Sequence, residues 1–134
     1  MIYLLDSNVW VAILRSKHPE VALRYGATDP ADVRICSVVV AELRHGCRKS
    51  AKPGANRAIL DALLAPVVSL PFDDAAAEHF SAIRHHLEST GQMIGPYDAQ
   101  IAAIALVNGC TLVTHNVAEV GRVPGLVVED WQNP

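Results

Sequence analysis

The chain lacks several features that would assign it at once to a broad class of protein. Its 134 residues carry a formal net charge of −3, so the overall positive field of many nucleic-acid-binding proteins is missing. Its cysteines (Cys36, Cys47 and Cys110) form no C-x-x-C pair, and their odd number argues against a disulfide framework. The six histidines show no metal-binding spacing such as H-E-x-x-H. Any nucleic-acid binding must therefore come from a local patch.

Signals for secretion and for the membrane are also missing. Residues 1–6 contain no basic segment followed by a long apolar run, as a signal peptide requires. Asn108 and Gly109 interrupt the longest apolar stretch well short of a membrane span. We therefore expect a cytoplasmic protein that has no membrane partner.

Small aliphatic residues are abundant. Hydrophobic residues make up 51% of the chain but aromatic residues only 5%, so Ala, Val, Leu and Ile must build the interior. This composition suits helices packed on a parallel sheet. The length favours one domain over residues 1–134, large enough to bury a core without disulfides.

Strand-length apolar segments alternate with helical patterns along the whole chain. Strands are predicted over residues 2–5, 33–36, 67–70, 111–114 and 126–128. Helices are predicted over residues 9–14, 19–27, 38–45, 55–64, 74–90 and 96–107. The alternation predicts an α/β domain of three layers, α/β/α, with a mostly parallel central sheet.

The ends of these helices are predicted from capping residues. Ser7 or Asn8 is expected to cap the first helix, and Ser37 the helix that Gly46 then ends. The valines at 38–40 suit a strand as well as a helix, and we favour the helix. Residues 115–119 are expected to form a loop.

The helix predicted over residues 96–107 carries an isolated acid. Pro96 suits the first helical position, and after Asp98 the segment is almost wholly apolar until Asn108. Such a helix belongs in a core. Asp98 therefore lies at the edge of the core, in the first turn of the helix. Favourable interaction with the helix dipole is the simplest explanation for an acid there.

Two other acids share this structural position. Asp6 ends the first strand, and Glu42 lies in the helix that follows the second strand. If the sheet is parallel, Asp6, Glu42 and Asp98 converge at its carboxyl edge. A further polar group, composed of Thr114, Asn116 and Glu119, follows the fourth strand to the same edge.

Clustered carboxylates repel one another unless a cation lies between them. Hard oxygen ligands without paired His or Cys indicate Mg²⁺ or Mn²⁺ rather than zinc. Such ions lower the pKa of a bound water and offset charge on a phosphoryl group, so phosphodiester hydrolysis is the most direct interpretation. Because any α/β domain can carry acids near its strand ends, this interpretation is plausible but not specific.

Four sequence blocks resemble a known family. Residues 5–9 (LDSNV), 37–46 (SVVVAELRHG), 95–102 (GPYDAQIA) and 111–116 (TLVTHN) are similar to the motifs of PIN-domain nucleases, and most similar to those of the VapC toxins. The blocks occur in order over essentially the whole chain. The resemblance implies a magnesium-dependent endoribonuclease, with Mn²⁺ as a substitute ion, whose catalytic and metal-binding acids are Asp6, Glu42 and Asp98.

The resemblance also implies partners and a cellular role. It implies that the chain is the toxin of a type II toxin–antitoxin system. Such a toxin inhibits translation and growth until a small VapB-type antitoxin neutralises it. A homodimer, or a hetero-oligomer with the antitoxin, is expected, with the antitoxin's C-terminal segment over the active-site groove. In one departure, Asn116 stands where many relatives have a fourth aspartate. Asn116 and Glu119 are therefore further candidate metal ligands, ranked below the three acids.

Several residues have both structural and functional interpretations. Ser7 and Thr114 lie beside the acids and are candidates to position them or a water, but we rank helix capping by Ser7 and loop geometry at Thr114 ahead of that role. The basic run over residues 44–52 is either a solvated loop or a phosphate clamp for RNA, with Arg44, Arg48 and Lys49 as the contacts. Tyr97, next to Asp98, is a candidate for substrate contact.

Competing functions remain open at this point. The chain is alternatively a PIN-like module that binds RNA or a partner with little or no catalysis. A receiver-like phosphoacceptor is disfavoured because residues 111–119 contain no lysine. A DNA-directed nuclease is a variant of the first interpretation.

Overall fold

The structure is a computed structural model that describes residues 1–133. Its elements, in chain order, are β1 (Tyr3–Leu5), α1 (Ser7–Arg15), α2 (Pro19–Gly26), a 3₁₀ turn (Pro30–Asp32), β2 (Val33–Cys36), α3 (Ser37–Arg48), α4 (Pro53–Leu64), β3 (Val68–Leu70), α5 (Asp74–Ser89), α6 (Pro96–Val107), β4 (Thr111–Val113), α7 (Val117–Val120) and β5 (Val128–Glu129). The strands and long helices match the elements predicted from hydrophobic periodicity to within a few residues at each end.

The five strands form one parallel sheet in the order β3-β2-β1-β4-β5. β1 lies at its centre, with Tyr3 opposite Val33 of β2 and Thr111 of β4. The order reverses at β1, because the chain goes first to β2 and β3 and then returns to β4 on the other side. Loops at the carboxyl edge separate there and leave room for a site. The predicted parallel sheet is confirmed.

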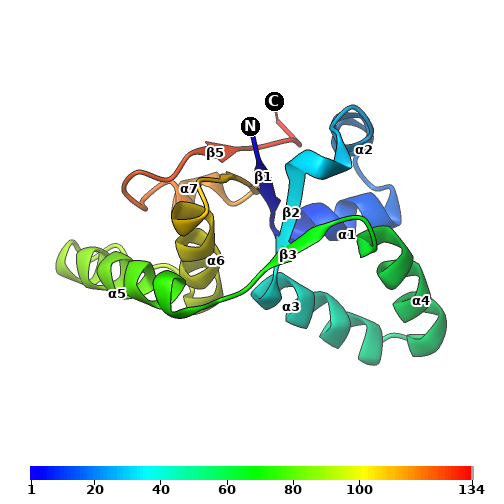
Figure 1. Cartoon of the computed structure of the whole chain (residues 1–134), viewed down its shortest axis with the longest axis horizontal. Helices are drawn as coiled ribbons and strands as arrows, with labels where there is room; N and C mark the ends of the chain where they lie inside the picture. The colour runs from blue at the N-terminus through cyan, green and yellow to red at the C-terminus, as the bar shows by residue number, and fades with distance from the viewer. Residues whose placement is uncertain (134) are drawn as a thin grey trace.

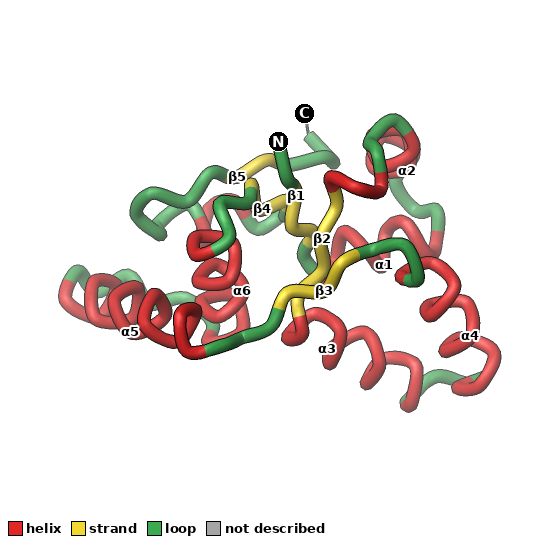
Figure 2. The backbone as a smooth tube through the Cα atoms, in the orientation of Figure 1, coloured by secondary structure: helices red, strands yellow, loops and turns green. Residues whose placement is uncertain are grey.

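Helices lie on both sides of the sheet, which Figures 1 and 2 show between α1–α4 on one side and α5 and α6 on the other. The central strands are largely apolar: Leu4, Leu5, Leu112 and Val113 are fully buried or nearly so. α6 is the core helix that its sequence predicts, with every residue from Ile101 to Ala105 buried. It packs against the sheet and against α5, where Ile83 and Leu87 meet it.

Helix termini differ from the sequence predictions in three places. Asp6, not Ser7 or Asn8, caps α1, and its carboxylate accepts a hydrogen bond from the Ser7 backbone N–H. α3 begins at Ser37 itself and includes Gly46, so Ser37 is not a cap and Gly46 does not end the helix. Residues 117–120 form the short helix α7 instead of a loop.

No helix within residues 1–133 is both long and apolar enough to cross a lipid bilayer.

Candidate active site

Asp6 is the most enclosed of the acids at the carboxyl edge of the sheet. It directly follows β1, and its side chain is only 7% exposed. One carboxylate oxygen caps α1, and the other accepts a hydrogen bond of 2.8 Å from the Thr114 hydroxyl. Both oxygens therefore have partners, and the direction of this carboxylate is fixed by β4 and by the start of α1.

Glu42 reaches the same region from α3. It lies in the second turn of that helix, on an exposed face, and its Oε1 accepts a hydrogen bond of 2.9 Å from the Ser7 hydroxyl. Ser7 thus joins two acids, because its backbone N–H binds Asp6 while its side chain binds Glu42. From the sequence, Ser7 was expected to cap α1 or to position an acid; Asp6 caps the helix instead, and the Ser7 hydroxyl donates to Glu42.

Asp98, Asn116 and Glu119 form the other half of the site. The Asn116 amide donates to Asp98 at 3.3 Å and to Glu119 at 3.2 Å. The Asn116 backbone N–H in turn donates to the Thr114 hydroxyl at 3.0 Å, which leads back to Asp6. Asp98 lies in the first turn of α6, as the sequence predicts, and is half-buried. One network of hydrogen bonds therefore runs from Glu42 through Ser7, Asp6, Thr114 and Asn116 to Asp98 and Glu119.

The four acids of this network disfavour one another's charged forms. The pKa of Asp98 is raised above its ordinary value, first by burial and then by the negative charges of Asp6, Glu119 and Glu42, although the Asn116 amide lowers it in part. The ion pairs within residues 1–133 involve none of these four acids. Asp98 therefore ionises at a cost, which a cation placed between the acids would remove.

The donor set suits a hard divalent cation, but the acids are not gathered into a ready-made cage. Within residues 1–133, no three His, Cys, Asp or Glu side chains stand together as a metal-binding group. The available donors are carboxylate, amide and hydroxyl oxygens, which Mg²⁺ and Mn²⁺ prefer. Burial and the neighbouring negative charges together raise the pKa of Asp98, and such an ion would offset both.

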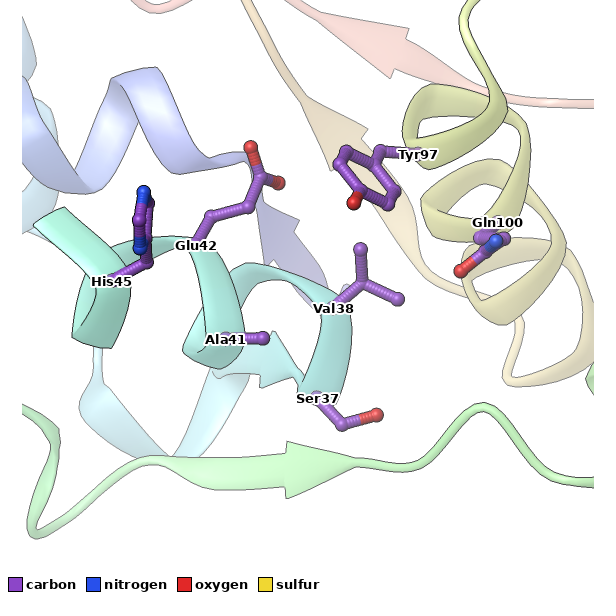
Figure 3. Close-up of a pocket in the computed structure, with 7 residues that line it drawn as sticks. All are labelled: Ser37, Val38, Ala41, Glu42, His45, Tyr97 and Gln100. Atoms are coloured by element: carbon purple, nitrogen blue, oxygen red, sulfur yellow. The ribbon is translucent and has the colours of Figure 1, made fainter.

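Two hollows meet at Glu42. The first is a pocket of about 380 Å³ between α3 and α6, lined by Ser37, Val38, Ala41, Glu42, His45, Tyr97 and Gln100. Figure 3 shows Tyr97 and Gln100 on α6 facing the α3 residues, with Glu42 at the rim opposite the Tyr97 ring. We refer to it as the α3–α6 pocket.

The second hollow, of about 280 Å³, lies between α1, α3 and α4, and we refer to it as the α1–α4 groove. Apolar residues of all three helices line it, among them Val11, Leu43 and Ile59. Arg15 and Lys49 add positive charge beside Glu42. Arg15, His45 and Gln100 are among the lining residues that the sequence did not single out as functional, because only the packing of α3 against its neighbours places them there.

The predicted RNA-binding cations are dispersed. Arg44 and Arg48 are exposed on α3, and Lys49 follows at its C-cap, so the first part of the basic run is helix rather than loop. Of the three, only Lys49 lines the groove beside Glu42. Tyr97 lies at the start of α6, and its side chain is 60% exposed.

Fold and site together define a class: three-layer α/β domains with an acidic site at the carboxyl edge of a parallel sheet. The PIN domain family model matches residues 3–123 of the chain. The chain belongs to the PIN domain family, and the proteins similar to it include VapC ribonucleases. It is 35% identical to the tRNA(fMet)-specific endonuclease VapC of Shigella flexneri, over 96% of this chain and 97% of that protein. Identity to Ribonuclease VapC2 of Rickettsia felis is 36%, over 98% of each chain.

Solved structures agree with this assignment. A crystal structure of DNA-bound VapBC from Salmonella typhimurium matches with a TM-score of 0.90 and 32% identity, over 98% of both chains. The structure of VapBC2 from Rickettsia felis bound to a promoter DNA fragment matches with a TM-score of 0.89 and 32% identity, over 98% of this chain and 99% of that chain. FitAcB from Neisseria gonorrhoeae matches with a TM-score of 0.88 and 26% identity, over 97% and 98%. The predicted family and fold are thus confirmed.

Proposed function

We propose that the chain is a divalent-metal-dependent endoribonuclease that acts as the toxin of a toxin–antitoxin pair in the bacterial cytoplasm. We propose a single domain over residues 1–134, which the near end-to-end match to VapC proteins supports. The observation that carries the proposal is the hydrogen-bonded network of four acids at the carboxyl edge of the sheet.

Asp6, Glu42 and Asp98 are the residues that we assign to hold Mg²⁺, or Mn²⁺ in its place, with Asn116 and Glu119 beside them. When bound, such an ion activates water and offsets negative charge on the phosphodiester. The network fixes Asp6 from two sides, since the backbone N–H of Ser7 and the hydroxyl of Thr114 each take one oxygen. The Ser7 hydroxyl donates a hydrogen bond to Glu42. The Asn116 amide nitrogen donates to both Asp98 and Glu119 at similar distances.

This fixation matters for the reaction. Carboxylates that are already oriented lose little freedom when the substrate and the ion bind, and preorganised charge is the largest contribution to many enzymatic rates. Thr114 and Ser7 are positioning residues here, because each touches an acid rather than the substrate. The uncharged Asn116 amide reduces the repulsion between Asp98 and Glu119 that a fourth aspartate would increase.

The partner follows from the relatives, whose solved structures are VapBC complexes. We propose a VapB-type antitoxin as the partner of this chain, and the α1–α4 groove as the surface that receives its C-terminal segment. The groove offers apolar contacts from Val11 and Ile59, and Glu42 is one of its lining residues, so a segment lying in it contacts one acid of the site. A homodimer is the expected state of the free chain.

Cleavage of RNA by the purified chain tests the proposal. With Mg²⁺ or Mn²⁺ the chain should shorten a single-stranded RNA, and it should leave the RNA intact in excess EDTA. Asp98→Asn should bind RNA without shortening it, whereas Asp61→Asn, an exposed acid of α4 paired with Arg57, serves as the matched control. Wild-type chain that retards RNA in a gel but never cleaves it, with any divalent ion, would establish the binding-module alternative instead.

A growth assay tests the cellular role separately. Induced expression of the chain should arrest a bacterial culture, and co-expression of the antitoxin encoded beside it should restore growth. Asp98→Asn should not arrest growth. Arrest by the Asp98→Asn protein would show that toxicity arises from something other than this site.

A further inference from the structure

The α3–α6 pocket shares a wall with the acid network but differs from it in chemistry. Glu42 belongs to both, since its carboxylate binds Ser7 and the residue also lines the pocket. Whatever occupies the pocket therefore lies beside one acid of the network. A volume of about 380 Å³ falls within the range of pockets that enclose small ligands.

Charge excludes one part of a nucleotide from this pocket. Among the described residues that line it, none is Lys or Arg, and Glu42 is an acid. A phosphate group would meet repulsion here, whereas an uncharged ring would not. The two cations near Glu42, Arg15 and Lys49, lie instead in the α1–α4 groove.

The walls of the pocket match the faces and edges of a flat heterocycle. Tyr97 is 60% exposed, and none of the three aromatic ring pairs found within residues 1–133 includes it, so its ring has a free face. Val38 and Ala41 form an apolar surface across from it (Figure 3). An exposed aromatic ring beside an apolar surface is the arrangement on which single-stranded nucleic acids stack their bases.

Polar groups at the edge of the pocket supply hydrogen bonds. The Gln100 amide offers both donors and an acceptor, and the His45 ring offers a further nitrogen. Figure 3 shows Gln100 on the same helix as Tyr97, one turn along, facing Ser37. Ser37 already accepts a bond from the Phe72 backbone N–H, which fixes that side of the pocket.

We propose that the α3–α6 pocket binds one unpaired nucleobase of the RNA, next to the phosphodiester that is cleaved at the acids. The base stacks on the Tyr97 ring, and Gln100 distinguishes one base from another. This inference rests on the proposed ribonuclease function and extends it to the choice of cleavage site. A pocket that accepts an extruded base also favours loops and single strands over duplex, because paired bases cannot enter it.

The test combines two changes, one in the protein and one in the RNA. Cleavage of a short RNA is compared with cleavage of the same RNA carrying an abasic nucleotide on one side or the other of the scissile bond. Tyr97→Leu, which keeps bulk but removes the ring, should lower kcat/KM on intact RNA by about tenfold, mostly through KM, since a base that stacks on the ring contributes to RNA binding. The abasic RNA should lose about the same factor with wild-type protein and lose nothing further with Tyr97→Leu.

Companion variants separate stacking from folding. Tyr97→Phe keeps the ring and should cleave as wild type does. Leu23→Ala, a similarly exposed residue on α2, should have no effect on cleavage. Gln100→Ala should change the preferred base at that position by about fivefold or more, with little change in melting temperature.

The outcomes distinguish the inference from the proposed function. If wild-type protein cleaves RNA but Tyr97→Leu and the abasic RNA each leave kcat/KM unchanged, the pocket does not bind a base, although the ribonuclease function stands. If Tyr97→Leu weakens only the complex with the antitoxin, the pocket belongs to the protein partner and the inference is overturned. Failure of wild-type protein to cleave any RNA would instead remove the function itself.

Discussion

The two halves of the acid network differ in how well the protein accommodates a charged carboxylate. Around Asp6, the carboxylate is buried and each of its oxygens accepts a short hydrogen bond. Around Asp98, the carboxylate is half-buried among three other acids, and its one hydrogen bond, from Asn116, is long. We refer to these as the fixed half and the repelled half.

The comparison separates two functions that one acidic site combines. The fixed half contributes to folding as well as to chemistry, because the same carboxylate that faces the site also caps α1. In the absence of a cation, the charged carboxylate of the repelled half lowers the stability of the folded protein. Ionisable groups held at the expense of stability are typical of functional sites. The same loss of charge should therefore have opposite effects on stability in the two halves.

The largest expected effects come from removing one acid in each half. Asp6→Ala and Asp98→Asn should each lower RNA cleavage by about 10²–10³-fold, because each removes fixed charge from the site. Their melting temperatures in EDTA should diverge. Asp6→Ala should lose about 1–2 kcal/mol with the cap of α1, whereas Asp98→Asn should melt above wild type because it removes a repelled charge.

Asp73→Ala is the matched control for the cap. Asp73 caps α5 by accepting from the Ala76 backbone N–H and has no hydrogen bond to the acid network, so its loss should lower stability without altering cleavage per folded molecule. Calorimetry and a single-turnover cleavage assay measure the two quantities. Equal destabilisation by Asp6→Ala and Asp98→Asn would contradict the division into two halves.

Thr114 tests the fixed half at its buried end. Its side chain is 1% exposed, donates to Asp6 and accepts from the Asn116 backbone N–H. Thr114→Val keeps the shape but leaves both partners unsatisfied, which should cost about 1–3 kcal/mol of unfolding free energy. Cleavage should fall by about 10–100-fold, the range seen when a residue that orients metal ligands is removed.

Thr111→Val provides the comparison, since Thr111 is also buried but lies at the start of β4, whereas Thr114 directly follows its end. It should change cleavage little. Chemical denaturation and cleavage kinetics of the two valine variants measure the difference. A Thr114→Val protein as active as Thr111→Val would show that the hydroxyl does not orient Asp6 for the reaction.

Much of this site follows from the sequence, because strand ends in a parallel sheet share an edge. That rule brings Asp6 and Glu42 to one region, and Asp98 joins them because α6 leads into the start of β4 and therefore begins at the opposite, carboxyl edge of the sheet. Local sequence does not determine which of Asp6, Ser7 and Asn8 caps α1, since all three residue types are good caps. The choice depends on β1 pairing, which holds Asp6 in extended backbone at φ −70° and ψ 163°.

Contacts between separate elements are what the sequence does not specify. The bond from Ser7 to Glu42 depends on how α1 packs against α3, and the two bonds of Asn116 depend on where α7 lies relative to α6. Asn116 was expected only as a weakened ligand, whereas its amide joins two acids. The α3–α6 pocket likewise combines residues 37–45 with 97–100, and no local pattern links those segments.

A smaller effect should appear in the pH dependence of stability without divalent ions. Because the folded-state pKa of Asp98 lies above its ordinary value, the native state holds this proton over an interval in which the unfolded chain has lost it. Stability should therefore fall as pH rises through that interval and then level off. Subtracting the curve for Asp98→Asn isolates this contribution, which should vanish at acid pH, where both proteins are uncharged at this position.

Excess Mg²⁺ should reduce the same pH difference, since a bound cation favours the ionised carboxylate. Urea denaturation from pH 3 to pH 8, with and without Mg²⁺, measures it. A difference curve that rises with pH would mean that Asp98 is stabilised by its neighbours, contrary to the repelled half as defined here.

The smallest effect is expected at Ser7, where the two functions of one residue can be separated. Ser7→Ala keeps the backbone N–H that binds Asp6 but removes the hydroxyl that binds Glu42. Because that bond is exposed, its loss should change stability by less than about 0.5 kcal/mol. Cleavage should nevertheless fall by about tenfold, since Glu42 then loses its orientation. Ser81→Ala, which removes an exposed serine hydroxyl bonded within α5, should leave cleavage unchanged. If Ser7→Ala cleaves as fast as Ser81→Ala, Glu42 needs no positioning, and the network ends at Asp6.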